Sequence, residues 1–410
     1  MAQASFRAFV GIAKDGNNAS LQIAHAGGAI ALTLRSIVQV STVLTAAGAT
    51  YSAVIVDGTL TETVACSGNL SATTDGATIA CAGLAHAHTA NAYVYFQLTA
   101  SIGPTAYIPV TDPGFADLIT QLEDTSFSGS NAQPFSIVQG NRTSEVTLAG
   151  NVYPDSFGYI LSNFMGAYDY VATSGGNPTT YAFSPNNQSN GQPTSYLYYV
   201  YNPGGANCRV FAGAAVEELG VKADPGAFVS WTAKIQAFAS GVVATPTASY
   251  SAFTALAGRL GTVTVAGTAS PKFVSLDITL KRDQSGPIPT FMGRQDPLDI
   301  FVGAAVVSGT FTVITDDDVQ LLNYLNGSQP AVTLSMLQGA TTAVNGIVFQ
   351  MTKCNYDSGT KANVKGKGWV ELTVPFKSVA NTTDISTAGG GRSPVLATLS
   401  TGTTTGAAIY

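Results

Sequence analysis

Charged side chains are scarce in this sequence of 410 residues. Asp, Glu, Lys and Arg make up 10% of it, whereas an ordinary soluble domain holds roughly 25%. Gly, Ala, Ser and Thr are abundant instead, and β-branched residues alternate with small polar ones. A chain with so few surface charges often buries much of its surface in an assembly, although a stable secreted β-protein has the same composition. Composition alone leaves both classes open.

Basic residues and long apolar runs are also few. The formal net charge is -6, which disfavours a protein that reads nucleic-acid sequence, because neutralising phosphates requires Lys and Arg. The first residues lack the apolar segment of a signal peptide, and no apolar run approaches the roughly 20 residues needed to span a bilayer. We therefore expect no membrane insertion, and a product that stays in the cytoplasm or leaves it within a particle.

The four cysteines show no C-x-x-C spacing. Cys66 and Cys81 flank a predicted hairpin whose turn is Asp75-Gly76. A disulfide between them is conceivable, but free thiols are favoured in a cytoplasmic product.

The three histidines are His25, His86 and His88. His86 and His88 would share one face of a strand, which is the geometry of half a zinc site. No third clustered ligand is visible in the sequence, so we interpret them as solvated strand residues and expect no metal site.

Catalytic motifs are missing as well. The sequence has no G-x-S-x-G, no H-E-x-x-H and no P-loop, and we expect neither an enzyme nor a cofactor. Asp316-Asp317-Asp318 could hold a divalent cation, but the three residues precede a predicted helix, where carboxylates accept its free amides and oppose its dipole. Capping is the favoured interpretation.

Half of the lysines gather near the C-terminal end. This cluster could face phosphates, but it is more typical of a solvated hairpin or of an interface edge that meets acidic neighbours. Its members are Lys353, Lys361, Lys365, Lys367 and Lys377.

The most informative stretch is Gly150–Gly166, which predicts a strand end, a cap, a short helix and a glycine stop. Asp155 is the expected N-cap, and Gly166 suits the left-handed residue that ends a helix. One helical face is apolar, so the helix should lie on a sheet, since about ten helical residues are marginal alone. The apolar residues are Phe157, Ile160, Leu161, Phe164 and Met165.

The same pattern returns at Gly309–Gly327. Here the Asp-rich cap leads into a second helix that would be closed by Gly327, and its apolar residues are Leu321, Leu322 and Leu325. Further along, Val210-Phe211, Trp231 and Phe238 match Val348-Phe349, Trp369 and Phe376 at one offset of 138 residues. We infer a tandem duplication of one β-rich domain with a packed helix, in which Trp231 and Trp369 occupy equivalent sites.

We therefore expect a mainly β fold, a β-sandwich or barrel with a short packed helix. Residues 1–14 with 105–250 would form the first domain and residues 251–385 the second, while 386–410 would be a C-terminal arm. Residues 15–104 hold many short β-like runs and predict an inserted all-β module. Residues 112–122 suggest a helical turn or an extended arm, and residues 171–195 an exposed loop.

Several of these segments resemble the tail tube (major tail) proteins of long-tailed bacteriophages. The resemblance covers roughly residues 1–14 and 105–385, and the order of its short motifs carries it. The motifs are Arg7-Ala-Phe-Val-Gly-Ile-Ala-Lys14, Ile108-Pro-Val, Gly150–Gly166, and the series Arg282, Gly293, Asp296-Pro297, Gly303 and Gly309.

This resemblance implies a structural virion protein, assembled in the host cytoplasm, whose stacked rings form the tail tube. Rings of three duplicated subunits would have pseudo-sixfold symmetry, with hexamers as the alternative. It also implies contacts with the tape-measure, tail terminator and distal tail proteins, and double-stranded DNA in transit. The inserted module fits the immunoglobulin-like decorations of such tails, and would lie on the tube exterior.

A second class is a β-rich tail adhesin, receptor-binding or decoration protein. Tyr168–Tyr170 or Tyr196–Tyr201 would then be a sugar-binding platform, although such tyrosines are more often core and interface residues. Glycan binding by the isolated protein separates this class from the first. A glycan hydrolase would require a pair of apposed carboxylates that the sequence does not reveal.

Overall fold

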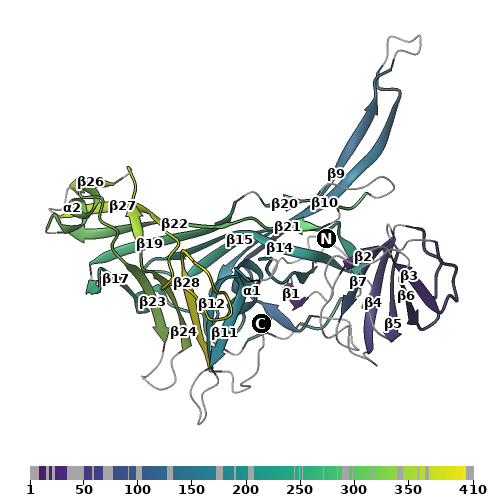
Figure 1. Ribbon diagram of the computed structural model, residues 1–410, viewed down its shortest axis with the longest axis horizontal. Helices are drawn as coiled ribbons and strands as arrows, with labels where there is room; N and C mark the ends of the chain where they lie inside the picture. The colour runs from purple at the N-terminus through teal and green to yellow at the C-terminus, as the bar shows by residue number, and fades with distance from the viewer. Residues whose placement is uncertain are drawn as a thin grey trace, which may run out of the picture.

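The protein is mainly β, as predicted, with two short α-helices and several antiparallel sheets (Figure 1). The computed structural model describes residues 9–14, 18–20, 24–34, 50–57, 60–67, 77–90, 92–97, 104–126, 133–171, 179–188, 191–201, 207–243, 245–248, 250–251, 253–270, 272–283, 285–288, 295–297, 299–315, 317–338, 345–358, 360–364 and 369–402. The Asp75-Gly76 turn, Gly293, Asp316, Lys365 and Lys367 lie outside these ranges.

The largest sheet has 13 strands, and its central order is β9-β10-β15-β14-β19-β22-β27, with β25 and β26 both on the far side of β27. β13, β1 and β8 branch from β14. The strands are β1 (Phe9–Lys14), β8 (Ala106–Ile108), β9 (Asp112–Asp124), β10 (Ser136–Asn151), β13 (Tyr196–Tyr201), β14 (Cys208–Ala223), β15 (Ser230–Ala237), β16 (Gly241–Val243), β19 (Phe273–Arg282), β22 (Ala305–Thr315), β25 (Cys354–Tyr356), β26 (Lys361–Val364) and β27 (Val370–Ser378).

A seven-stranded sheet covers one face of the large sheet, and one apolar core joins residues of both. Trp231 and Phe311 enter this core from the large sheet, and Phe349 and Leu399 from the smaller one. The order is β11 (Gly166–Val171), β12 (Thr179–Pro185), β28 (Leu396–Thr401), β24 (Asn345–Met351), β23 (Val332–Gln338), β17 (Gly261–Val265) and β18 (Thr268–Ser270). Helix α1 (Phe157–Met165) packs against strands of both sheets.

A separate six-stranded sheet, with its own apolar core, lies within the predicted insertion. β4 also contributes Val54 to a cluster with Leu197, Tyr199 and Val210 on the outer face of the large sheet. The strands are β2 (Asn18–Ser20), β3 (Ala31–Leu34), β4 (Thr50–Asp57), β5 (Leu60–Ser67), β6 (Ala77–Cys81) and β7 (Tyr93–Gln97). The cysteines Cys66 and Cys81 face each other in the β5–β6 ladder and are free thiols.

Strand β13 is buried on both faces where the module meets the large sheet. Tyr196 and Tyr198 point into the main core, while Leu197 and Tyr199 join the cluster with Val54. The run of apolar and aromatic residues without polar alternation follows from this double burial.

Two segments that we predicted to be irregular each contain a central strand of the smaller sheet. Residues 171–195 contain β12, whose Tyr181 and Phe183 are fully buried. Residues 386–410 were expected to form an arm, but β28 pairs with both β12 and β24 in the middle of its sheet. These segments are rich in Ser, Thr, Gly and Asn. The alternation of apolar and polar residues that predicts a strand is weak there, because small polar residues occupy many positions.

Strand order repeats along the large sheet. β9-β10-β15-β14 is followed by β19-β22-β27 and then by β25 and β26. In each set, the second strand leads into a helix and then into a hairpin of the smaller sheet, β11–β12 after α1 and β23–β24 after α2 (Val319–Leu325). Val210-Phe211 and Val348-Phe349 lie on non-matching strands, β14 and β24, so one offset of 138 does not relate the two sets.

The remaining elements are short. β20 (Gly286–Pro287) pairs with β21 (Ile300–Phe301) in the connection between β19 and β22, and a 3-10 turn, Gly258–Leu260, precedes β17. Among the described helices, none is long and apolar enough to cross a membrane.

Candidate assembly surfaces

The large sheet has one polar face, opposite the core. Along β19, Leu276, Ile278 and Leu280 are buried while Asp277 and Lys281 are exposed, which is the period of two of a strand with one solvated face. Threonine and serine fill most other positions of this face. They include Thr147, Thr232, Thr279, Ser308, Thr310, Thr312 and Thr373.

Two lysines of this face are held by carboxylates, whereas Lys281 is exposed. Lys234 Nζ lies 3.3 Å from Glu145 and 3.7 Å from Glu217, and Lys222 Nζ lies 3.0 Å from Asp224. The hydrogen bond to Glu145 raises the pKa of Lys234. A cation paired in this way has little charge left to attract a phosphate.

The outer edges of the large sheet are open. Within the described residues, β9 pairs only with β10, and β25 and β26 pair only with β27. Unpaired edges are ready to accept a strand from another chain, and native proteins cover or pair them.

The β9–β10 hairpin extends beyond the sheet as an arm, visible as the long projection in Figure 1. β10 pairs with β15 from Ser144 onward, whereas residues 136–143 pair only with β9. These eight residues span about 26 Å. The alternative of a helical turn in residues 112–122 is therefore wrong, and the extended arm is confirmed.

The arm carries exposed apolar side chains, which are Leu118, Ile119, Leu122, Phe135, Ile137 and Val138. An isolated two-stranded ribbon is marginally stable in water. Exposed apolar residues on such a ribbon indicate an interaction surface.

The base of the arm is fixed by a partly buried ion pair with the connection between β20 and β21. Arg142 donates from Nε and one Nη to the two carboxylate oxygens of Asp296, at 2.8 and 3.0 Å, and its backbone amide donates to Gln295 at 3.0 Å. A bidentate pair fixes orientation as well as distance. The motif residue Asp296 therefore positions the arm.

Helix α1 is buried on every side. All nine of its residues are buried, including Asn163. The prediction that its apolar face lies on a sheet is confirmed, but the polar face is buried as well. Asn163 donates to Thr194 and Ala214 carbonyls at 2.9 and 3.0 Å and accepts from Tyr198 at 3.2 Å. Its polar groups are thus satisfied inside the core, as burial requires.

The ends of α1 differ in how well the sequence predicts them. The N-cap is Ser156, with no capping bond from its side chain, so Asp155 as N-cap is wrong; the backbone of Tyr153 accepts the Phe157 amide at 3.1 Å instead. Gly166 ends the helix at φ 84, as predicted, and a Cβ there would lie 2.6 Å from Pro193 Cα.

Arg282, at the end of β19, covers the C-terminus of α1. Its guanidinium donates to Phe164 O, to Met165 O at 3.3 Å and to Gly303 O at 3.1 Å, and it lies 4.9 Å from the centre of the Phe164 ring. A cation at this position complements the helix dipole. Burial lowers the pKa of Arg282 to about 10, so it stays protonated at neutral pH.

Helix α2 is exposed, unlike α1. None of its residues is buried, and Leu322 and Leu325 are 50% and 67% exposed, with Leu321 half-buried. Asp317 accepts the amide of Val319 at 3.2 Å, while the N-cap residue Asp318 makes no capping bond with its side chain. Gly327 follows with φ 63. Val319 also lines a groove of about 360 Å³ beside β22.

The two tryptophans differ in environment. Trp231 is 1% exposed and donates to Asn151 O at 3.0 Å. Trp369 is 38% exposed and donates to Glu371 at 3.1 Å. Trp231 lies near the start of β15, which pairs with β10, the strand before α1. Trp369 directly precedes β27, which pairs with β22, the strand before α2.

A glycine under an aromatic ring recurs in both strand pairs. A Cβ on Gly150 would lie 3.2 Å from the Trp231 ring, and a Cβ on Gly309 would lie 2.5 Å from the Phe376 ring. Phe376, rather than Trp369, therefore covers the second glycine as Trp231 covers the first, and the prediction that the two tryptophans occupy equivalent sites is wrong.

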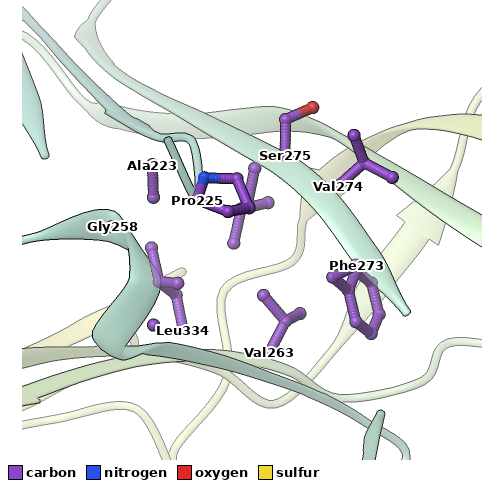
Figure 2. A pocket seen from close by; sticks show the side chains of 10 residues that line it. Ala223, Pro225, Gly258, Val263, Phe273, Val274, Ser275 and Leu334 are labelled. Carbon is purple, nitrogen blue, oxygen red and sulfur yellow. The ribbon is translucent and has the colours of Figure 1, made fainter. Parts of the chain in front are cut away.

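Nothing in the described part of the chain resembles a metal centre. The described residues hold no group of three or more His, Cys, Asp or Glu that could bind a metal. His88 is buried and lies 3.0 Å from Glu62, and its backbone pairs with that of half-buried His25. His86 is exposed and lies outside the strands. The prediction that His86 and His88 are solvated residues on one strand face is therefore wrong for His88, and the two do not share a strand. Figure 2 shows a cavity of about 40 Å³, lined mainly by apolar side chains such as Val263, Phe273 and Leu334.

Comparison with known proteins agrees with this architecture. No curated protein matches the chain. The sequence model of the phage tail tube protein family matches residues 87–378, a segment that holds the arm, both helices and most of the two large sheets. Members of this family are structural, non-enzymatic parts of the virion, and a match over more than two thirds of the chain establishes membership. The chain belongs to the phage tail tube protein family.

Proposed function

We propose that three copies of this chain close into a ring with pseudo-sixfold symmetry, and that stacked rings form the conduit for double-stranded DNA. The observation that carries this proposal is a large sheet with two open edges, one polar face and a repeated strand order. The polar face would line the lumen.

The repeated strand order supports two tube domains in one chain. We assign residues 1–14 with 105–250 to the first domain and residues 251–385 to the second, with β28 completing the sheet that both share. The glycine–aromatic contacts of Gly150 and Gly309 support the same equivalence. Trp231 and Trp369 then belong to equivalent strands, with only Trp231 turned into the core.

Strand number is consistent with an open conduit. From β9 to the edge shared by β25 and β26, the large sheet of one chain has eight strand positions. Three chains would therefore supply 24. At about 4.8 Å between strands, the backbone circumference is about 115 Å and its diameter at least about 37 Å. Barrels of more than about 16 strands enclose a channel instead of a packed core.

The chemistry of the polar face suits DNA in transit. Threonine and serine offer neutral hydroxyls, and Lys222 and Lys234 are neutralised by neighbouring carboxylates. Each lysine that contacts a phosphate adds salt-dependent affinity. A wall on which most lysines are paired with carboxylates holds DNA weakly and lets it slide.

Stacking would use the distal part of the arm. Leu122, Ile137 and Val138 are exposed there, on a ribbon that extends about 26 Å beyond the sheet. The tape-measure protein would fill the lumen before DNA passes, and the tail terminator and distal tail proteins would close the ends of the tube. Helix α1, held by Arg282, would stiffen the wall.

The six-stranded module would lie outside the tube, as an immunoglobulin-like decoration. It contacts the large sheet through Val54, on the branch formed by β13 and β14, and has its own core. A deletion of residues 16–104 should therefore leave tube formation possible, and loss of assembly would show that the module belongs to the wall.

Electron microscopy of the purified chain tests the proposal. We expect tubes whose cross-section shows three subunits, six equivalent wall segments and three outer modules. Six subunits per ring would refute the trimer, and a chain that remains monomeric under all conditions and is absent from virions would refute the tube.

A further inference from the structure

Two cysteines of the six-stranded module lie side by side and have no role in the tube. Cys66 of β5 and Cys81 of β6 are direct partners in an antiparallel ladder (Figure 1). Both side chains face the apolar core of the module, because Cys66 belongs to that core and half-buried Cys81 packs against it. Both are free thiols, so the pair is open to oxidation.

The backbone hydrogen bonds around this pair bring the two side chains close together. The amide of Ala82 donates to Ala65 O at 2.8 Å. The amide of Cys81 points away from β5 and donates to Ile30 O at 2.9 Å. Cys66 and Cys81 are therefore a non-hydrogen-bonded pair, whose Cα atoms lie about 4.5 Å apart in an antiparallel ladder. A disulfide requires a Cα separation of about 4.4–6.8 Å, so the backbone can accept one without moving apart or together.

The pair lies at a short junction in the module. The described part of the β5–β6 ladder consists of Cys66 with Cys81 and the next pair along, Ser67 with Ala80. The neighbouring β4–β5 ladder, by contrast, runs over the whole of Thr50–Asp57. Since the strand order is β2-β7-β4-β5-β6-β3, this junction alone joins β6 and β3 to the other four strands within the described ladders. A covalent bond here would connect the two parts of the sheet.

Neither thiol is activated for rapid reaction. Burial, followed by the neighbouring Cys81, raises the pKa of Cys66 to about 12. Burial and the charge of Glu62 also raise the pKa of Cys81. Because the thiolate is the nucleophile, both groups react slowly at neutral pH. Each thiol donates only a weak hydrogen bond to a backbone carbonyl, at 3.7 Å for Cys66 and 3.8 Å for Cys81. Little is lost when these protons leave, so the pair suits a structural disulfide that forms slowly.

We propose that Cys66 and Cys81 form a structural disulfide after the virion leaves the reducing cytoplasm, and that this bond joins β6 and β3 covalently to the rest of the module. Tail tube proteins are components of the virion. The cytosol keeps thiols reduced, whereas disulfides form and persist outside the cell. The inference goes beyond the proposed ring and does not depend on its stoichiometry.

The oxidant is a small-molecule disulfide such as oxidised glutathione. The thiolate of Cys81, the more exposed of the two residues, attacks one sulfur of the oxidant, forms a mixed disulfide and releases one small thiol. The thiolate of Cys66 then attacks the sulfur of Cys81 and releases the second small thiol. Two protein thiols are oxidised and one small disulfide is reduced, and the two protons from the protein pass to the released thiols.

Peptide mapping without reduction tests the proposal. The full chain is purified with a reductant, incubated with oxidised glutathione at pH 8.5, and unfolded in an alkylating reagent. We expect loss of two of the four thiols and a peptide pair linked through Cys66 and Cys81. Cys208 and Cys354 are internal controls, since they are 0% exposed and belong to other clusters, and both should stay reduced. Four remaining thiols, or a final product that carries glutathione on Cys81, would overturn the proposal. So would a reduced pair in virions purified without reductant.

Calorimetry of the full chain tests the effect of the bond on the module. Closing a loop of about 15 residues restricts the unfolded chain, so oxidation should raise the melting temperature of the module by about 5–20 °C. Cys81→Ala should lose both the cross-link and this rise, whereas the matched variant Cys208→Ala should keep both. Equal melting temperatures for the oxidised and reduced chain would refute the stabilising role. A chain that pairs its cysteines but forms no tubes would refute the proposed ring and leave the disulfide standing.

Discussion

Replacing Arg282 by methionine tests how the two halves of the chain support each other. Methionine keeps an unbranched apolar stem but removes the donors that reach Phe164 O, Met165 O and Gly303 O. Met165 O retains the amide of Asn186 at 2.9 Å, so the main loss falls on the other two carbonyls.

The expected cost follows from leaving buried carbonyls without these donors. Each lost partner costs about 1–3 kcal/mol, so leaving two carbonyls without these donors costs about 2–6 kcal/mol in total. Arg282 is 3% exposed, so water cannot easily replace it. For a folding unit of 150–250 residues, such a loss lowers the melting temperature by about 4–24 °C.

Urea unfolding of the unassembled chain, followed by tryptophan fluorescence, measures this cost. Trp231 reports on the site, because its ring lies 6.1 Å from that of Phe157 in α1. The control is Arg392→Met, an exposed arginine, which should change the free energy of unfolding by less than about 0.5 kcal/mol. Arg282→Lys, which keeps the charge and fewer donors, should fall between the two. A loss below about 1 kcal/mol for Arg282→Met would refute the reasoning.

Three further predictions concern other sites. Val263→Ile adds one methylene to the 40 Å³ cavity and should raise the free energy of unfolding by about 0.5–1 kcal/mol in the same urea assay; a loss would show that the cavity wall is rigid. Gly309→Ala, whose new Cβ would lie 2.5 Å from the Phe376 ring, should lower it by about 2–4 kcal/mol, and no change would mean that the ring moves aside freely. Burial opposes the charged form of Glu62, but hydrogen bonds from two amides and a histidine hold the pKa of this carboxyl below its usual value. Its contribution is therefore present above the unfolded pKa and lost as the pH falls through the folded one, so Glu62→Gln should remove part of the acid-side loss of stability seen in wild-type melting curves from pH 7 to 3.

Capping and helix-ending residues were predicted correctly in some places. Gly166 ends α1 through its positive φ, and Asp317 accepts the amide of Val319 at the start of α2. Both effects act within one helical turn, so the sequence alone predicts them. Asp155 fails the same test because the backbone of Tyr153 takes the role expected of its side chain.

Sheet interiors were harder to predict. β12 and β28 are rich in Thr, Ser and Ala, yet they lie side by side in the smaller sheet, where neighbouring strands supply both hydrogen bonds and apolar contacts. The polar residues inside α1, such as Asn163, likewise find partners only in segments distant along the chain. Arg282 gained its significance in the same way, from the position that the ladders give it.

The sequence by itself determined the mainly β class, the two strand–cap–helix units and the absence of catalytic motifs, since each depends on composition or on residues a few positions apart. Only the tertiary structure decided which helix is buried, which edges stay open and which face is polar. Those properties arise from strand pairs such as β14 with β19 and β12 with β28, and pairing between distant segments depends on the free energy of the whole fold.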